Sequence, residues 1–197
     1  MSILLPIKLI VGLQNPGPDY AQTRHNAGAW FVTSLSAQQN LKFSTDKKFN
    51  ALLAAWPDRA CTLMLPLSFM NHSGHALRAF CHFYRISPAE VLVAHDDLDL
   101  SVGRIKLKTG GGHGGHRGLR DIIAQLGSAD FHRIRIGIGH PGTKEQVVDH
   151  VLAGPSRADR QQILLATDRA LNVIQTIIAG DTAAAMNILN NEGTDGI

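Results

Sequence analysis

Apolar residues in this chain occur in short runs that favour β-strands and in longer stripes that favour helices. Residues 7–13 and residues 91–94 are almost continuously apolar, which is typical of strands buried on both faces of a sheet. Two further short runs flank the turn at Pro57 and Asp58, and two segments alternate basic with apolar residues, as half-buried strands do. These four additional strands are predicted at residues 52–56, 60–65, 104–108 and 133–138.

Helical spacing is clearest in the stripe formed by Gly28, Phe31, Val32 and Leu35, with Thr23 as the expected N-cap. Other helices are predicted at residues 70–84, at residues 119–126 (ended by Gly127), and at residues 157–179, with a shorter helix after the last. Strands interleaved with helices in this way predict an α/β sandwich around a mixed β-sheet.

The composition fits one globular domain with a sizeable core, because the chain has 197 residues of which 44% are hydrophobic. We find no linker-like segment and no internal repeat. The first residues lack the basic segment and cleavage site of a signal peptide, and no apolar run is long enough to cross a membrane. Cys61 and Cys81 lack CxxC spacing and are expected to be core thiols, so we expect a cytoplasmic protein.

Polar residues follow three of the predicted strands. Asn15 comes after the first strand, Asn71 after the strand at 60–65, and Asp96 after the strand at 91–94. His25 opens the first helix. If the strands are parallel, their carboxyl ends share one edge of the sheet, where α/β proteins bind ligands. Each residue alone has an ordinary explanation, as a turn former or a surface histidine, but together they predict a site at that edge.

These four side chains fit a hydrolase that activates water. Asp96 on one ring nitrogen of His25 would fix the tautomer and stabilise the imidazolium as it forms, leaving the other nitrogen to take a proton. The amide of Asn71 could donate to a developing oxyanion, and that of Asn15 could hold a substrate carbonyl. The chain has no GxSxG motif and no cysteine beside a histidine, so direct attack by water is the simpler hypothesis.

The segment 110–118, GGGHGGHRG, lies between a basic strand and a helix. We interpret it as a backbone-rich loop that approaches a ligand closely, with the helix N-terminus offering N–H groups to an anion. A flexible surface loop is the plainer alternative. Its histidines also raise a metal hypothesis, in which Asp96, Asp97, His113 and His116 hold Zn²⁺, although no zinc motif is present and the glycines would make a poorly rigid frame.

Basic residues alternate with apolar ones on the two strands near this loop. They are Arg104, Lys106, Lys108, Arg133 and Arg135. Such residues are common on a solvated sheet face. They are also what a phosphate track for nucleic acid requires, and the net charge of +3 agrees weakly with an anionic partner.

Six ordered motifs resemble those of the bacterial peptidyl-tRNA hydrolase family along nearly the whole chain. They are IVGLQNPG (10–17), TRHNAG (23–28), FMNHSG (69–74), VAHDDLD (93–99), GGGHGGHRG (110–118) and RIGIGHPG (135–142). The resemblance implies hydrolysis of the ester between a peptide and the 3′-terminal ribose of tRNA, by a monomer without metal or other cofactor. It also implies a single domain over residues 1–197, a three-layer α/β/α sandwich with a twisted mixed sheet.

Carried over by position, the resemblance makes His25 the general base and Asp96 the residue that holds it in its basic form. Asn71 would bind substrate near the scissile ester, and Asn15 would distinguish peptidyl-tRNA from unblocked aminoacyl-tRNA. Tyr20 and Phe69 match positions that contact the 3′ end of the tRNA. Met70, His116 and Arg117 are further residues expected to bind the substrate or the tRNA. Those expected to bind the acceptor stem and its 5′-phosphate are Lys106, Lys108 and Arg135.

One position departs from the family pattern, where the residue after the last loop histidine is commonly asparagine. Here it is Arg117. A guanidinium only donates hydrogen bonds, whereas an amide both donates and accepts, so a water-holding role at this position is in doubt. The alternatives to a peptidyl-tRNA hydrolase are an RNA-binding module of the same fold with impaired catalysis, and a metal-dependent esterase.

Overall fold

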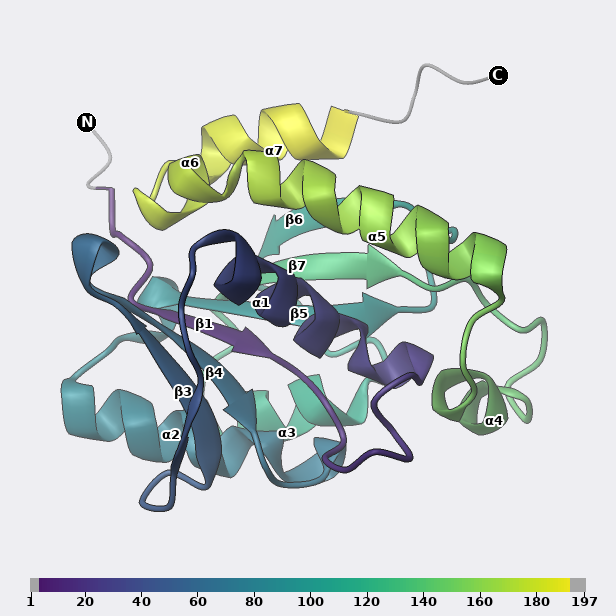
Figure 1. Cartoon of the computed structure of the whole chain (residues 1–197), viewed down its shortest axis with the longest axis horizontal. Helices are drawn as coiled ribbons and strands as arrows, with labels where there is room; N and C mark the ends of the chain where they lie inside the picture. Colours follow the sequence, from purple (N-terminus) through teal and green to yellow (C-terminus); the bar gives the residue numbers. More distant parts are fainter. Residues whose placement is uncertain (1–3, 192–197) are drawn as a thin grey trace.

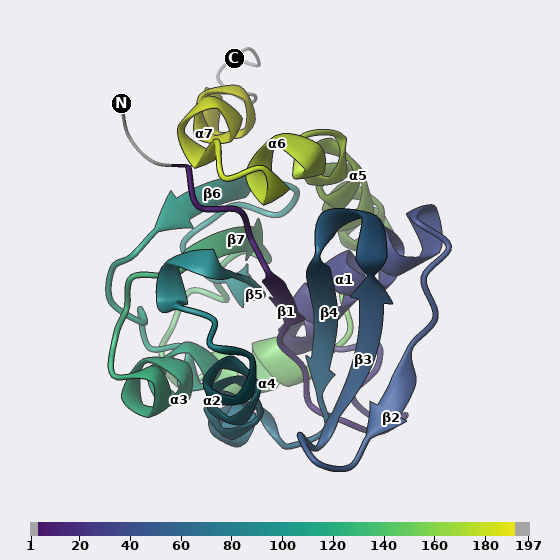
Figure 2. The same cartoon turned by 90° about the vertical axis from the view of Figure 1, so that its left-hand side faces the viewer.

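The computed structural model describes residues 4–191, which form a seven-stranded mixed sheet with helices on both faces (Figures 1 and 2). The strand order is β2-β3-β4-β1-β5-β7-β6. Pairs β1–β4, β1–β5 and β5–β7 are parallel, and pairs β2–β3, β3–β4 and β6–β7 are antiparallel. The strands are β1 (Leu9–Gly12), β2 (Ser44–Asp46), β3 (Ala51–Trp56), β4 (Cys61–Pro66), β5 (Val91–Asp97), β6 (Ile105–Thr109) and β7 (His132–Gly137). The predicted mixed sheet is confirmed.

Helices cover the sheet in two layers. The longer helices are α1 (Ala27–Gln38), α2 (Ser73–Tyr84), α3 (Arg117–Leu126), α5 (Arg157–Asn172) and α7 (Thr182–Asn191). The shorter ones are α4 (Val147–Leu152) and α6 (Ile174–Ile178), with 3-10 turns η1 (Arg24–Asn26), η2 (Pro57–Arg59), η3 (Met70–His72) and η4 (Pro88–Glu90). Helices α1 and α5 lie on one face of the sheet, and α2 and α3 lie on the other (Figure 1).

Two apolar clusters, one on each face, hold these layers together. Alternate residues of one strand enter different clusters: Ile10 and Leu92 pack with α1 and α5, whereas Val11 and Val93 pack with α2 and α3. This is the alternation of side chains along a strand. It also explains why the central strands appear continuously apolar in the sequence, since both faces are buried. The predicted three-layer α/β/α sandwich is confirmed.

Three expectations about local structure were wrong or incomplete. The helix predicted at residues 157–179 breaks at Val173, where φ is −103° and ψ is 6°, so that α6 can turn its apolar residues into the core. Thr23 has no capping hydrogen bond, because its hydroxyl donates to the Tyr20 carbonyl instead. The short elements β2 and α4 were not predicted, because β2 is a three-residue polar strand and α4 has only six residues.

The carboxyl ends of β1, β4, β5 and β7 meet at one edge of the sheet, and α4 lies beyond that edge (Figure 1). The start of α1 packs directly on these ends. A Cβ on Gly28 would come within 2.1 Å of the Ala94 carbonyl oxygen, and a Cβ on Gly12 would come within 2.6 Å of the Gly28 carbonyl oxygen. Glycine at both positions therefore lets η1, which carries His25, reach the end of β5. Within the described residues, no helix has the length and apolar character needed to cross a membrane.

Candidate active site

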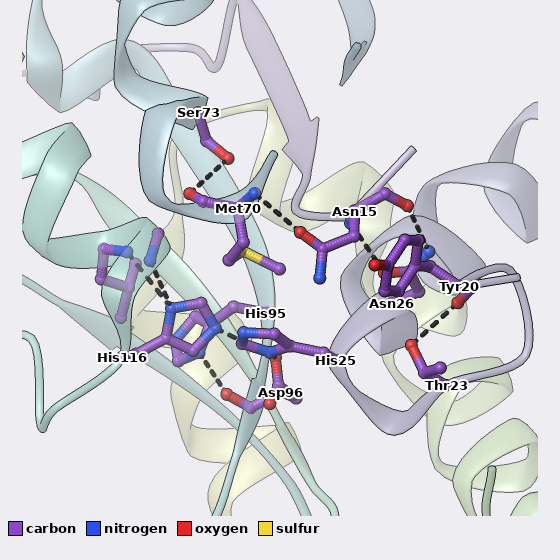
Figure 3. Close-up of polar contacts among 12 residues, drawn as sticks. Asn15, Tyr20, Thr23, His25, Asn26, Met70, Ser73, His95, Asp96 and His116 are labelled. Carbon is purple, nitrogen blue, oxygen red and sulfur yellow. Dashed lines mark hydrogen bonds and ion pairs between the residues drawn. The ribbon is translucent and has the colours of Figure 1, made fainter. Parts of the chain in front are cut away.

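His25, Asp96 and His116 meet at the end of β5 (Figure 3). The Nδ1 atom of His25 lies 2.9 Å from Oδ1 of Asp96, and Nε2 of His116 lies 3.0 Å from the same oxygen. The Asp96 residue is only 3% exposed. Three segments far apart in the sequence therefore place two imidazoles on one buried carboxylate.

The hydrogen bonds determine which ring nitrogens carry protons. Nδ1 of His116 accepts from the backbone N–H groups of Gly118 and Leu119, at 3.1 and 3.2 Å, so Nε2 must carry the proton that it donates to Asp96. The Asp96 carboxylate oxygen can only accept a hydrogen bond, so Nδ1 of His25 must likewise carry a proton and donate it to this oxygen. This leaves Nε2 of His25 unprotonated and able to accept a proton.

The contact between His25 and Asp96 shifts the pKa of both groups. Burial lowers the pKa of His25, but the charge and hydrogen bond of Asp96 outweigh burial, so that this pKa lies above its ordinary value of 6.5; the charge of Arg117 opposes the rise. Burial alone would raise the pKa of Asp96, yet the His25 and His116 rings hold it well below its ordinary value. Asp96 is therefore ionised at neutral pH.

Asn15 connects the end of β1 with η1 and η3. Its Oδ1 accepts from the Met70 N–H at 2.8 Å. Its backbone pairs reciprocally with the side chain of Asn26, which accepts from Asn15 N at 2.8 Å and donates to Asn15 O at 2.9 Å. With Oδ1 engaged, the side-chain Nδ2 of Asn15 is left as the donor, and Figure 3 shows it pointing away from the Met70 backbone N–H, toward the side where His25 lies. The amide is thus oriented to donate.

All four predicted catalytic residues line one cavity of about 540 Å³, but they are not equally close. His25 and Asp96 are in contact, whereas Asn71 is exposed on η3 and its Nδ2 lies 3.2 Å from Nε2 of His72. The same cavity is lined by most of the expected substrate-binding residues, which are Tyr20, Phe69, Met70, Lys108, His116, Arg117 and Arg135. Lys106 is outside the cavity lining, although it lies opposite Arg135 in the β6–β7 register.

The cavity lining combines residues of different character. Tyr20 and Phe69 pack edge to face with ring centroids 6.0 Å apart, and 53% of Phe69 is exposed. Residues of α4 add an apolar wall on which Val148 and Leu152 are exposed. The lining also includes the basic residues Lys108 and Arg135, with Nε of Arg135 2.7 Å from Oδ2 of Asp97. The cavity thus pairs apolar and aromatic surfaces with positive charge.

Sequence reasoning missed several residues that build this site. Arg133 was grouped with Arg135 as part of a basic face, but it is buried and bonds the loop backbone instead. His95 is also buried, and burial together with the neighbouring His116 ring lowers its pKa to about 3, so it is neutral. Asn26 stands next to His25 within the TRHNAG motif, which was the only signal of its role.

The metal hypothesis does not fit the donor atoms. Among the described residues, the group whose ligand atoms lie within 4.8 Å of one another is His25, Asp96 and His116, without the predicted Asp97 and His113. A metal-binding imidazole normally donates its other N–H to an acceptor. Nδ1 of His116 instead accepts from two N–H groups, which keeps the proton on the nitrogen that would have to bind the metal.

Comparison with known proteins agrees with this geometry. The peptidyl-tRNA hydrolase family model matches residues 9–195. The peptidyl-tRNA hydrolase of Legionella pneumophila (strain Lens) is 58% identical over 188 residues, which are 94% of this chain and 100% of the relative. That of Coxiella burnetii (strain RSA 331 / Henzerling II) is 50% identical over 185 residues, covering 94% and 98%. The chain belongs to the peptidyl-tRNA hydrolase family.

The fold comparison gives the same result. The crystal structure of the peptidyl-tRNA hydrolase from Acinetobacter baumannii matches with a TM-score of 0.92 and 45% identity, covering 97% of this chain and 98% of that one. The resemblance drawn from six sequence motifs is therefore confirmed at the level of the peptidyl-tRNA hydrolase family.

Arg117, the departure from the pattern expected of peptidyl-tRNA hydrolases, begins α3 and is exposed in the cavity lining. Its charge is close enough to His25 to oppose the rise in the pKa of that histidine. An asparagine at this position would bring no charge. Arginine in place of asparagine at position 117 therefore changes the electrostatics around the His25 imidazole as well as the hydrogen-bonding capacity at this position.

Proposed function

We propose that this chain hydrolyses the ester bond between the peptide and tRNA in peptidyl-tRNA, with His25 as the general base that activates water. The observation that carries the proposal is the contact between Nδ1 of His25 and Oδ1 of Asp96, which leaves Nε2 free to accept a proton beside the cavity. Membership of the peptidyl-tRNA hydrolase family supplies the substrate class.

The proposed reaction begins when Nε2 of His25 takes a proton from a water molecule as its oxygen attacks the ester carbonyl carbon. Asp96 stabilises the imidazolium that forms. The carbonyl oxygen becomes an oxyanion, to which the amide of Asn71 donates. When the tetrahedral intermediate collapses, the bond to the ribose oxygen breaks, and the proton on His25 passes to that leaving oxygen.

We assign the choice of substrate to Asn15 and to the aromatic residues of the cavity lining. The Asn15 amide, held in a donating orientation by its bond to Met70, would donate to a peptide carbonyl that an unblocked aminoacyl-tRNA lacks. The exposed ring of Phe69, packed against Tyr20, offers a stacking surface for the bases of the 3′ CCA end. His116 and Arg117 border the same space.

Lys108 and Arg135 are proposed to bind the acceptor stem and its 5′-phosphate, with Lys106 on the same strand face. We expect Lys108→Ala or Arg135→Ala to raise KM for peptidyl-tRNA, because each removes one phosphate contact. The slope of log KM against log salt concentration should fall by about 1 for each variant. Lys42→Ala, which removes an exposed lysine just after α1, is the control. A salt slope equal to that of the wild type would remove the residue from the phosphate site.

Arg117→Asn is expected to preserve or raise activity if arginine is merely tolerated at this position. Because the charge of Arg117 opposes protonation of His25, its removal should also move the acidic limb of the pH–rate profile to higher pH. The measurement is kcat/KM as a function of pH for the wild type and the variant. Collapse of activity across the whole pH range would mean that arginine has a substrate contact of its own.

Release of the N-acetylated amino acid from N-acetyl-aminoacyl-tRNA tests the proposed function, with unblocked aminoacyl-tRNA as the control substrate. We expect rapid release from the blocked substrate and slow release from the control. Equal release from both would contradict the role of Asn15, and no release from either would contradict the function. From the family resemblance, we also propose that the protein acts as a monomer and as a single domain, in the cytoplasm where translation supplies its substrate.

A further inference from the structure

Arg133 lines the same cavity as Arg135, but unlike Arg135 it is almost fully buried. The residue lies on β7 and is only 3% exposed. Its Nη1 donates to the Gly112 carbonyl oxygen at 2.6 Å, and its Nη2 donates to the Gly111 carbonyl oxygen. Both acceptors belong to residues 110–116, here called the glycine loop. One guanidinium thus holds two successive carbonyl groups of this loop.

No carboxylate neutralises this buried cation directly. Within the described part of the chain, no ion pair includes Arg133, and its buried Nε has no hydrogen-bond partner. Burial lowers the pKa of Arg133, Arg135 lowers it further, and the charge of Asp97 opposes both. The Phe131 ring lies 4.7 Å from the guanidinium carbon. A buried charge without a paired carboxylate is costly, so core stability alone does not account for an arginine here.

The glycine loop has little packing that would define its shape, and its own hydrogen bonds are confined to the turn in which the Gly115 and His116 N–H groups donate to Nδ1 and the carbonyl oxygen of His113. Gly110, Gly111, Gly114 and Gly115 all have positive φ, between 55° and 94°. A Cβ placed on Gly112, Gly114 or Gly115 would meet no atom within 4 Å. A backbone with this freedom and so little packing keeps one conformation only if groups outside the loop hold it.

Two anchors hold the loop, one at each end. At its start, the Gly110 N–H donates to the Phe131 carbonyl oxygen at 3.0 Å, and Arg133 binds the next two carbonyls. At its end, His116 donates to Asp96. The first anchor lies next to Lys108: a Cβ built on Gly111 would be only 2.9 Å from the Lys108 ammonium nitrogen. The loop backbone therefore supports a residue of the proposed phosphate site.

We propose that Arg133 is a positioning residue, which fixes the glycine loop through the Gly111 and Gly112 carbonyls and thereby sets His116 on Asp96 and Lys108 beside the cavity. The proposal rests on the proposed function for its effect on catalysis, but not for its effect on the loop. Arg133 does not touch the reacting atoms. It acts through the backbone of the loop, and no sequence pattern separates it from Arg135.

The test uses Arg133→Lys, which keeps the charge but replaces the planar fork by a single ammonium that cannot hold two carbonyls in the same geometry. We expect amide hydrogen exchange in residues 110–116 to become faster by about tenfold or more, while exchange in β5 stays unchanged. In peptidyl-tRNA hydrolysis, kcat should fall on the order of tenfold to a hundredfold. KM should rise as well, because Lys108 loses its support, whereas loss of folded protein alone would leave KM unchanged.

Arg160→Lys is the matched control. The guanidinium carbon of Arg160 also lies over an aromatic ring, 4.4 Å from the centre of the Trp30 ring, but Arg160 belongs to α5 and not to β7. It should leave loop exchange and both kinetic constants as they are. Loop exchange equal to that of the wild type in a folded Arg133→Lys protein overturns the proposal, whatever the activity. Hydrogen exchange needs no substrate. If the wild-type protein failed to cleave peptidyl-tRNA, the proposed function would be refuted, but the exchange measurement would still test the role of Arg133 in the loop.

If Arg133→Lys does not fold, a measurement on the wild type tests whether Arg133 holds the Gly111 and Gly112 carbonyls. Nuclear magnetic resonance should find slowly exchanging Nη protons on Arg133, with Overhauser contacts to Gly111 and Gly112. Rapidly exchanging Nη protons without such contacts would overturn the proposal.

Discussion

Replacing His25 by alanine is expected to lower kcat for peptidyl-tRNA hydrolysis by about 10²–10⁴-fold, the range in which a placed general base contributes. The loss should appear in kcat because the imidazole acts on water in the transition state. KM should change little, since the proposed contacts to tRNA lie on other residues. Single-turnover hydrolysis of N-acetyl-aminoacyl-tRNA by excess enzyme measures this directly.

The control is His82→Ala, which removes an exposed histidine of α2. It should retain wild-type kcat. In the His25→Ala protein, Asp96 keeps its hydrogen bond from His116, so we expect the variant to fold, which thermal unfolding verifies. Near-normal kcat in a folded His25→Ala protein would exclude His25 as the base.

Asp96→Asn is the second change with a large expected effect, a loss in kcat on the order of 10²–10⁴-fold. A neutral amide cannot stabilise the imidazolium that forms during the reaction. If the amide nitrogen faces Nδ1 of His25, it donates to the ring and forces the proton onto Nε2, which can then no longer accept one from water. The same amide would also leave the N–H of His116 without its carboxylate partner.

The pH dependence of the Asp96→Asn protein should change with a defined sign. The charge and hydrogen bond of Asp96 raise the pKa of His25 above 6.5, and activity needs His25 neutral. The rate of the wild type therefore falls as the pH drops through a midpoint above 6.5. In Asp96→Asn the residual activity should show a midpoint at lower pH. Asp168→Asn, at an exposed position of α5, is the control; a midpoint unchanged by Asp96→Asn would contradict the proposed link.

The strands of the sheet could be predicted well because the hydrophobic pattern that indicates each strand lies within the strand itself. Continuous apolar runs at β1 and β5 follow from burial on both faces, and the alternation at β6 follows from burial on one. The same alternation at β7 was misleading, because β7 is buried on both faces and Arg133 is among its buried residues. The convergence of His25 and Asp96 was also predictable, since both follow from strands that end at the same edge. The break at Val173 was not, because tertiary packing of α6 outweighs a helical pattern that continues through it.

The finer parts of the site depend on contacts that sequence spacing does not contain. Arg133 and Arg135 occupy equivalent places in the alternating pattern, yet one is buried against the glycine loop and the other pairs with Asp97. The tautomer of His116 follows from two backbone N–H groups at the start of α3, and only the structure places them on Nδ1. Asn71 was expected at the same edge of the sheet and lines the cavity there, but sequence spacing did not reveal that its side chain is exposed and lies next to His72.

The most direct test of the account compares two quantities in the wild-type protein: the pKa of the His25 imidazole from its nuclear magnetic resonance titration, and the midpoint of the acidic limb of kcat/KM. We predict that the two values coincide and that both lie above 6.5, because the group that must lose its proton for catalysis is the imidazole that Asp96 holds. A His25 that titrates below 6.5, or far from the midpoint of the rate profile, would contradict the assignment of this histidine as the base.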